Sequence, residues 1–296
     1  MQKKKVLSST MTENYNNNMK INLVQNGIFP IKTQLEKDST GYKVPGTIQG
    51  EGLFLGTSCI FIRTSGCNLR CSFLGLDGKG SPCDTPYSSH FPEKNLTEIS
   101  DVVQTVKDNT KDQGIRHVVI SGGEPTIQTA ALEELVYQLW LEGYLVTIET
   151  NATIFSEKLT HYAHLISMSP KLSNSTPWVP NLEGTGIKYN DKWAERHERD
   201  RINIKTISEY ILATTANCNL YQLKFVVATD DDIREIESIL EQLPLYSPEM
   251  VYLMPEGVDA ETLTARSNWC VEQAIQRGWS FTPRLHVMLW GKNRYV

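Results

Sequence analysis

The stretch FIRTSGCNLRC, residues 61–71, decides how the rest of the chain is interpreted. It begins as an apolar, β-branched strand pattern and ends in a polar loop with Cys67 and Cys71. Cys83 follows, so that three cysteines lie within seventeen residues. Thiolates are soft ligands that select zinc, copper(I) or iron–sulfur clusters. The stretch therefore predicts a thiolate metal site directly after a strand.

The number of thiols narrows the choice of metal. A structural zinc site normally has four protein ligands, and no second Cys-x-x-Cys or His pair follows at a suitable distance. Three ligands leave one coordination position open, which in a [4Fe–4S] cluster is an iron available to a substrate or cofactor. Two alternatives stay open, namely zinc with a remote fourth ligand such as His90, and three unrelated thiols.

On both sides of this loop, apolar runs alternate with amphipathic stretches. Strand patterns cover residues 59–63, 116–120, 144–149, 164–168, 221–227, 249–254 and 280–287. Helical patterns cover residues 97–111, 129–142, 206–215, 231–243 and 260–276. Such alternation predicts an α/β fold with a mainly parallel sheet, open or closed into a barrel, whose ligands lie at the carboxyl ends of the strands.

Two segments interrupt this alternation, and a third precedes it. Residues 1–18 are polar and rich in Asn, and are expected to form a disordered leader. The remainder, 19–296, is expected to be one domain with insertions at about 72–82 and 172–205. The charged run AERHERDR, 194–201, is interpreted as a solvated helix face rather than a binding element.

Composition excludes several classes of protein. The 296 residues contain 29 Lys and Arg against 34 Asp and Glu, a balance that argues against general nucleic-acid binding. No apolar run approaches the roughly 18 residues of a membrane span. Six cysteines and no signal-peptide pattern indicate the reducing cytoplasm. Outside the cysteine loop, Cys59, Cys218 and Cys270 are interpreted as structural or incidental.

A second motif gives the cysteine loop a context. The run SGGEP, residues 121–125, follows a later predicted strand, and its glycines permit close approach of backbone to a ligand. Together the two motifs resemble the radical S-adenosylmethionine (SAM) superfamily. The resemblance implies a partial, incomplete TIM-like barrel, a [4Fe–4S] cluster whose open iron chelates SAM, and a Gly-Gly-Glu-Pro turn beside the SAM amino group.

The flanking sequence resembles one family of that superfamily, the 7-carboxy-7-deazaguanine synthases. The matching runs are GTIQGEG (46–52), FIRTSGCNLRC (61–71), CDTPY (83–87), ETN (149–151), SPK (169–171), QLKF (222–225) and RLHV (284–287). One departure is the Cys-x3-Cys-x11-Cys spacing, where the superfamily has two residues before the third cysteine. Because the insertion is rich in Gly, it can loop out and return Cys83. Phe73 or Pro82 then stands where the family has an aromatic residue.

The resemblance implies a carbon–nitrogen lyase. It would convert 6-carboxy-5,6,7,8-tetrahydropterin to 7-carboxy-7-deazaguanine with loss of ammonia, in the biosynthesis of 7-deazapurines such as queuosine. It also implies Mg²⁺, a flavodoxin-like electron donor and a homodimer. Two alternatives are weighed against it, namely a glycyl-radical-activating enzyme and a non-catalytic zinc or iron–sulfur module. The first leaves the QGEG strip (49–52), Arg63 and the Asp84–Thr85 pair unexplained.

The same resemblance assigns roles to individual residues. The cluster ligands are Cys67, Cys71 and Cys83, and the Mg²⁺ ligand is Thr85. The pterin contacts are Ile48, Gln49, Gly50, Arg63 and Ser121, with His286 as a weaker candidate. The SAM contacts are Pro82, Asp84, Gly123, Glu124, Glu149, Ser169, Lys171, Gln222 and Lys224.

Some of these residues also have an ordinary structural interpretation. A guanidinium suits a carboxylate ligand, but Arg63 could equally form an internal salt bridge. Thr85 could cap a helix, Lys224 could extend its charge out of an apolar strand, and His286 could be a packed histidine.

Overall fold

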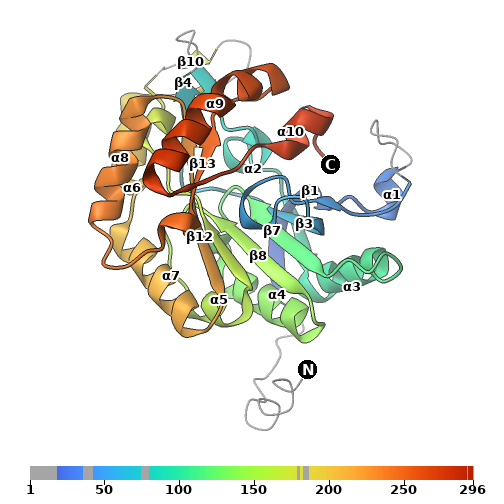
Figure 1. The fold of residues 1–296 in the computed structure, drawn as a ribbon. Helices are drawn as coiled ribbons and strands as arrows, with labels where there is room; N and C mark the ends of the chain where they lie inside the picture. Colours follow the sequence, from blue (N-terminus) through green and yellow to red (C-terminus); the bar gives the residue numbers. More distant parts are fainter. Residues whose placement is uncertain are drawn as a thin grey trace.

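The computed structural model describes residues 19–35, 43–74, 80–178, 181–182, 187–291 and 293–295 (Figure 1). The expected leader, 1–18, and the middle of the first insertion lie outside the described residues. Among the described residues, seven strands run parallel in one sheet. They are β3 (Ser58–Thr64), β7 (His117–Gly122), β8 (Leu145–Thr150), β9 (Leu165–Met168), β12 (Leu220–Val227), β13 (Val251–Pro255) and β14 (Ser280–Phe281).

These strands coincide with the apolar runs of the sequence, with one exception. The predicted strand 280–287 is wrong in its second half, because β14 ends at Phe281 and helix α10 (Leu285–Trp290) follows. Pro283 lies between them, and a proline has no N–H to donate to a strand ladder.

Three strands that the sequence pattern did not indicate extend the sheet. β1 (Lys20–Phe29) pairs antiparallel with β3 and with β6 (Asn95–Glu98), and β2 (Thr47–Ile48) pairs antiparallel with β3. The sheet runs from β14 to β6, and no pairing among the described residues joins its two ends. The sheet is therefore mainly parallel and open, as the predicted incomplete barrel requires.

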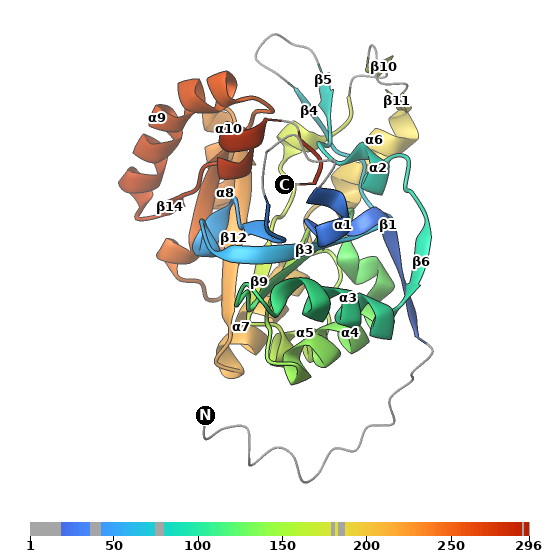
Figure 2. The same ribbon diagram turned by 90° about the vertical axis from the view of Figure 1, so that its right-hand side faces the viewer.

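Helices cover the outer face of the curved sheet (Figures 1 and 2). They are α3 (Ile99–Thr110), α4 (Thr129–Leu141), α5 (Glu157–Tyr162), α7 (Ile204–Ala216), α8 (Asp230–Glu241) and α9 (Ala260–Arg277). Their apolar faces and the strands form one continuous core of buried Leu, Ile and Val side chains. Removing apolar surface from water contributes roughly 1.5–3 kcal/mol per large side chain, so this core fixes the strand ends that carry the site.

Short elements gather at the carboxyl ends of the parallel strands (Figure 2). They are the hairpin β4 (Ser72–Leu74) and β5 (Gly80–Pro82), α2 (Pro86–Ser89), the pair β10 (Asn181–Leu182) and β11 (Ile187–Lys188), and α6 (Asp191–Asp200). Much of the 172–205 insertion is thus regular structure. Helix α1 (Lys32–Leu35) lies instead beside the C-terminal end of α3, where the Lys32 amide donates a hydrogen bond of 2.8 Å to Asn109 Oδ1.

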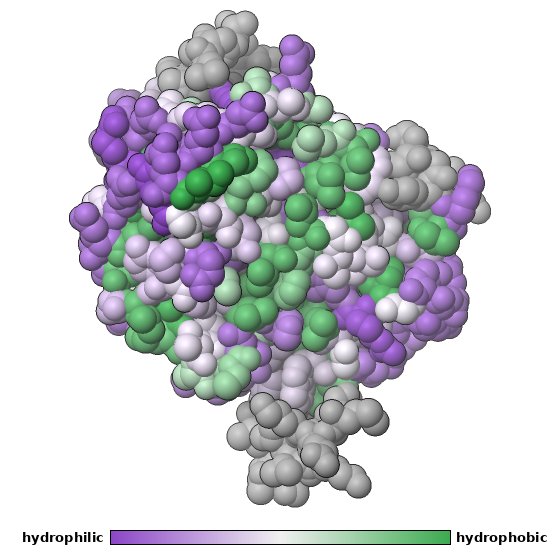
Figure 3. Space-filling model, viewed as in Figure 1, coloured by the Kyte–Doolittle hydropathy of each residue, from purple (hydrophilic) through white to green (hydrophobic). Residues whose placement is uncertain are grey.

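The surface mixes polar and apolar areas (Figure 3). Exposed large apolar side chains include Ile275 of α9 and Met288 and Leu289 of α10. Within the part of the chain that the structure describes, no helix is long and apolar enough to cross a membrane.

Candidate active site

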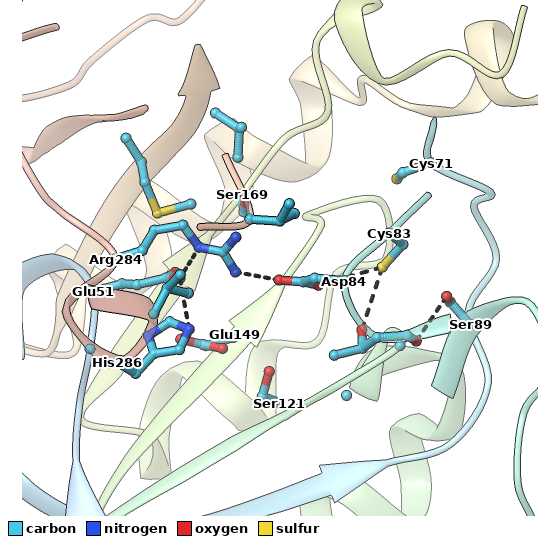
Figure 4. Close-up of a pocket in the computed structure, with 18 of the residues that line it drawn as sticks. Glu51, Cys71, Cys83, Asp84, Ser89, Ser121, Glu149, Ser169, Arg284 and His286 are labelled. Atoms are coloured by element: carbon cyan, nitrogen blue, oxygen red, sulfur yellow. Dashed lines mark hydrogen bonds and ion pairs between the residues drawn. The ribbon is translucent and has the colours of Figure 1, made fainter. Parts of the chain in front are cut away.

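A cavity of about 610 Å³ lies at the carboxyl ends of the parallel strands. Small-molecule sites usually measure roughly 300–1,000 Å³. Nearly all of the residues singled out from the sequence line it. They are Ile48, Gln49, Gly50, Arg63, Cys67, Cys71, Pro82, Cys83, Asp84, Thr85, Ser121, Gly123, Glu149, Ser169, Lys171, Lys224 and His286. Figure 4 shows several of them converging from separate strands and loops.

The long cysteine spacing is resolved by a hairpin. Strands β4 and β5 pair antiparallel, so that Ser72 lies opposite Pro82. The Cys83 amide then donates a hydrogen bond of 3.1 Å to the Cys71 carbonyl. Cys83 therefore returns beside Cys71 although eleven residues separate them, and Phe73 and Pro82 both line the cavity.

The donor set suits an iron–sulfur cluster. All three thiols are free, and burial raises the pKa of Cys67 to about 12 and that of Cys71 and Cys83 above the usual range. Such thiols bind as thiolates only when a bound cation offsets the cost of desolvation. The residues thus fit three cluster ligands held in a shielded wall of the cavity.

His90 does not serve as the fourth ligand that the zinc alternative requires. Its Nε2 lies 2.5 Å from the Tyr189 hydroxyl and its Nδ1 lies 3.0 Å from Ser89 Oγ, so both ring nitrogens are engaged. The described residues also contain no group of three His, Cys, Asp or Glu side chains spaced to hold a single metal ion.

The SGGEP turn packs directly on the cysteine loop. A Cβ on Gly123 would lie 2.1 Å from the Gly66 carbonyl oxygen, so only glycine fits. The Glu124 amide donates a hydrogen bond of 2.8 Å to the same carbonyl. Gly66 itself has φ of +99°, in the region that favours glycine. The two motifs thus form one unit that presents backbone groups to the cavity.

Two predicted SAM contacts lie elsewhere. The Glu124 carboxylate is fully buried and accepts from the Thr126 amide at 3.1 Å, the Thr150 hydroxyl at 2.7 Å and the Asn151 amide at 2.5 Å. Its partners hold it inside the turn, outside the cavity lining. Gln222 is equally committed, because it accepts from the Leu53 amide at 2.8 Å and donates to Ser167 at 2.7 Å. Both therefore fix the walls around the site instead of facing it.

The strip after β2 and Arg63 both line the cavity. Gln49 donates to Glu149 Oε1 at 3.2 Å, and Gly50 lies so close to the His286 ring that a Cβ would clash with it. The Arg63 guanidinium lies over the Phe29 ring, 5.3 Å from its centroid. No described acidic side chain forms an ion pair with Arg63, and its buried Nε has no hydrogen-bond partner. The structural salt bridge considered for Arg63 is thus absent from the described residues.

A chain of alternating charges crosses one side of the cavity. Lys224 Nζ lies 2.5 Å from Glu51 and 3.7 Å from Glu149, and Arg284 pairs with Glu51 at 3.1 Å and also with Asp84. Burial alone would raise the pKa of Glu51, but Lys224 and Arg284 outweigh it and hold that pKa well below its usual range. Glu51 and Arg284 lay in matching motifs, yet nothing in the sequence indicated that they would meet (Figure 4).

The remaining predicted residues lie on the strand ends. Ser121, the next-to-last residue of β7, lines the cavity, while Lys171 donates to Ser169 Oγ at 2.9 Å after β9. Thr85 occupies the N-cap position of α2, but its side chain makes no capping bond. Its hydroxyl instead lies 3.4 Å from Cys83 Sγ.

Helix α6, from the charged run 194–201, supports the cysteine loop. His197 is 2% exposed, and its Nδ1 accepts from the Arg70 amide at 3.3 Å. The Arg70 guanidinium lies over the Trp193 ring at 5.0 Å, and the Tyr189 hydroxyl donates to the Cys71 carbonyl at 3.3 Å. The run is helical as predicted, but the face that carries His197 is buried against the site.

Fold, thiols and glycine turn together define a radical SAM protein. A family model described as the radical SAM superfamily matches residues 61–173. A 7-carboxy-7-deazaguanine synthase of Rhodopirellula baltica is 38% identical over 246 residues, covering 83% of this chain and 84% of the relative. One of Halobacterium salinarum is 38% identical over 249 residues, covering 82% and 87%. The chain belongs to the 7-carboxy-7-deazaguanine synthase family.

A solved structure supports the fold. The crystal structure of QueE from Escherichia coli aligns with a TM-score of 0.58 at 20% identity, covering 93% of this chain and all of that one. Membership of the superfamily implies a [4Fe–4S] cluster and SAM.

Proposed function

We propose that this chain converts 6-carboxy-5,6,7,8-tetrahydropterin to 7-carboxy-7-deazaguanine with release of ammonia. The observation that carries the proposal is one cavity with three free thiols in its wall and, in the same lining, the unpaired Arg63 and the strip Ile48–Gly50. This arrangement joins a cluster site to a site for a small anionic heterocycle. Family membership favours it over a glycyl-radical-activating enzyme and over a non-catalytic metal module.

The cluster and SAM, when bound, supply the reductively formed radical that removes hydrogen from C6 of the pterin. The chain binds and orients the substrate and excludes water. Arg63 offers a planar fork to the substrate carboxylate, and its position over Phe29 limits how that fork can turn. Gln49 and the backbone of Ile48 and Gly50 contact the polar edge of the pterin.

Ser121 and His286 complete the substrate side of the proposal. Ser121 projects from the end of β7, and His286 lies against Gly50 with its Nε2 4.0 Å from Glu51. Because Glu51 is held as a carboxylate by Lys224 and Arg284, it presents a fixed negative charge beside the imidazole.

The SAM side of the cavity is assigned to the backbone at Gly123 and to side chains on the other strand ends. Gly123 has no side chain between its backbone and the ligand. The other proposed contacts are Pro82, Asp84, Glu149, Ser169, Lys171 and Lys224. Glu124 and Gln222 act on SAM only through the walls they hold in place.

A Mg²⁺ ion is proposed at Thr85. Magnesium prefers oxygen ligands and keeps several waters, so one hydroxyl plus substrate oxygens is a suitable set. The Thr85 side chain is free of any capping bond and lies in the cavity lining.

Two partners complete the proposal. A flavodoxin-like donor would supply the electron for SAM cleavage. A second copy of the chain would form a homodimer, and the exposed apolar side chains Ile275, Met288 and Leu289 offer apolar surface for it. Light scattering of the purified protein measures the dimer directly.

The function is tested by anaerobic reconstitution with iron and sulfide, followed by assays with SAM and a chemical reductant. We expect about four irons per chain, SAM cleavage, and 7-carboxy-7-deazaguanine only when the carboxylated pterin is added. The matched substrate is tetrahydropterin without the 6-carboxylate, which lacks the group that Arg63 binds. A colourless protein that contains one zinc ion would refute the proposal that the chain is a radical SAM enzyme. SAM cleavage without formation of 7-carboxy-7-deazaguanine would refute the assignment of the carboxylated pterin as the substrate.

A further inference from the structure

Cys83 needs a support that the other two cysteines do not. Cys67 and Cys71 lie on a short loop held by β3, the SGGEP turn and α6. Cys83 is reached only after the long β4–β5 hairpin, which fixes its amide through the Cys71 carbonyl. On its other side the chain continues into Asp84, whose side chain is 46% exposed. Burial therefore does not fix this side of Cys83.

The Arg284 guanidinium supplies a contact on this side through Asp84, in addition to the Thr85 hydroxyl that lies 3.4 Å from Cys83 Sγ. Its Nη2 pairs with the Asp84 carboxylate, its Nε pairs with Glu51 Oε1 at 3.1 Å, and its Nη1 donates to the Gly257 carbonyl at 2.9 Å. The Arg284 side chain is only 12% exposed. Each of its three nitrogens thus binds a different segment of the cavity wall (Figure 4). A planar fork with several donors makes such a junction, whereas a lysine ammonium is a single point charge.

The same contact controls charge beside a thiol. Cys83 Sγ lies 3.8 Å from Asp84 Oδ1, so a Cys83 thiolate would face a carboxylate directly. Arg284 is the cation paired with that carboxylate. Removing Arg284 would leave that carboxylate without its ion-pair partner, with only the weaker attraction of Arg63 to offset its negative charge next to the cysteine.

We propose that Arg284 is a positioning residue that holds Asp84, and through it Cys83, and that compensates the Asp84 charge beside this cysteine. The inference rests on the proposed function in taking Cys83 as a cluster ligand. Groups that orient metal ligands typically change metal affinity or activity about 10- to 100-fold when they are removed.

The test measures the reconstituted cluster without any pterin. We expect Arg284→Gln and Asp84→Asn each to lose iron to a chelator about tenfold faster than the wild type, because both break the ion pair between Arg284 and Asp84. The double variant should lose iron no faster than Arg284→Gln alone, because that variant has already lost this ion pair. Arg284→Gln should shift the cluster midpoint potential to more negative values, and Asp84→Asn to more positive values, because they leave opposite charges unpaired.

Two further variants separate positioning from general stability. Arg284→Lys keeps the charge and loses the fork, so its potential should stay near that of the wild type while iron loss remains faster. Arg277→Gln is the matched control, because it removes another arginine of an ion pair, at 2.6 Å from Glu237, away from the cavity. Its iron loss and potential should equal those of the wild type. If Arg284→Gln does not fold, Arg284→Lys and Asp84→Asn carry the test.

Wild-type iron loss and potential in Arg284→Gln would overturn the proposal, as would shifts of the same sign in Arg284→Gln and Asp84→Asn. An equal effect in Arg277→Gln would also overturn it, as general destabilisation. Product formation by the wild type is measured in parallel. A wild type with a cluster but no deazaguanine would refute the function and leave the role of Arg284 standing.

Discussion

Arg63 is a candidate substrate-binding residue because no described carboxylate forms an ion pair with it. Most of the buried charges around the cavity are paired, as Lys224 is with Glu51. Arg63 instead lies on an aromatic ring, and no described carboxylate pairs with it. A guanidinium held ready in this way suits a carboxylate that arrives with the substrate.

Replacing Arg63 by Lys tests this role. Hydrogen bonds to charged groups contribute about 1.5–3 kcal/mol, so we expect the KM for the carboxylated pterin to rise roughly 10- to 100-fold. SAM cleavage without pterin should stay unchanged, because the cysteine loop keeps its contacts. An unaltered KM would contradict the assignment.

Cys83 and Cys218 form a natural pair for testing the ligand choice. Cys83 lines the cavity, whereas Cys218 is exposed in the turn between α7 and β12. Cys83→Ala should abolish iron binding in the reconstituted protein, and Cys218→Ala should retain it in full. Equal iron contents in the two variants would show that the third ligand is another group.

Most of the residues that the family resemblance singled out line the cavity, but the sequence did not show which groups each side chain contacts. Glu124 and Gln222 stand in matching motifs, and their carboxylate and amide are occupied by neighbouring groups. The junction at Arg284 was missed for the complementary reason. It joins residues 51, 84 and 284, which are distant in sequence, and a local sequence pattern does not predict contacts between such distant residues.

Among the elements, the SGGEP turn and the cysteine loop behave as one unit. Gly123→Ala would place a Cβ 2.1 Å from Gly66 O and 2.6 Å from Ser88 O, both of them backbone atoms that cannot move cheaply. We expect lower iron content and a lower melting temperature. Gly114→Ala is the control, because its Cβ meets open space and only its φ of +66° costs stability. That variant should melt earlier but bind full iron, and the same iron loss in both variants would contradict the steric argument.

The supporting role of helix α6 was not predicted, because its composition is typical of a solvent-exposed helix. Its sequence, DKWAERHERD, is charged nearly throughout, and the buried residues are Ala194 and His197. Periodicity indicated a helix, but two buried residues do not reveal which surface they cover. The hairpin was easier to anticipate, because the glycines and Pro82 indicated a turn that returns Cys83.

For the whole molecule, buried histidines dictate a response to acid. Burial lowers the pKa of His117 and His197 from 6.5 to about 4. Below pH 6.5 these histidines bind protons in the unfolded chain but stay neutral in the folded chain. Their contribution to the free energy of unfolding is therefore fully present above pH 6.5 and is lost as the pH falls towards 4. Each histidine contributes a slope of up to about 1.4 kcal/mol per pH unit.

Denaturant unfolding of the apoprotein at several pH values between 7 and 4.5 measures this slope. The His117→Asn variant should show a shallower dependence on pH than the wild type, because one of the histidines that stay neutral in the folded chain is gone. A free energy of unfolding that is constant over this range, or that rises as the pH falls, would contradict the assignment.

The positions of the parallel strands along the chain were predictable because strands buried on both faces have continuous apolar sequences. The antiparallel edge was not. β1, with the sequence KINLVQNGIF, mixes polar with apolar residues, and β2 has only two residues. The carboxyl ends of the parallel strands were thus known from the sequence, and the walls that close the cavity on the other side were not.

The central claim is that the protein catalyses the ring contraction of a carboxylated pterin in this cavity, beside a cluster held by three cysteines. Mass spectrometry of an anaerobic reaction with SAM, reductant and the carboxylated tetrahydropterin tests it most directly. The account predicts 7-carboxy-7-deazaguanine and ammonia from the wild type, and neither from Cys83→Ala. Release of 5'-deoxyadenosine with the pterin recovered unchanged would contradict it.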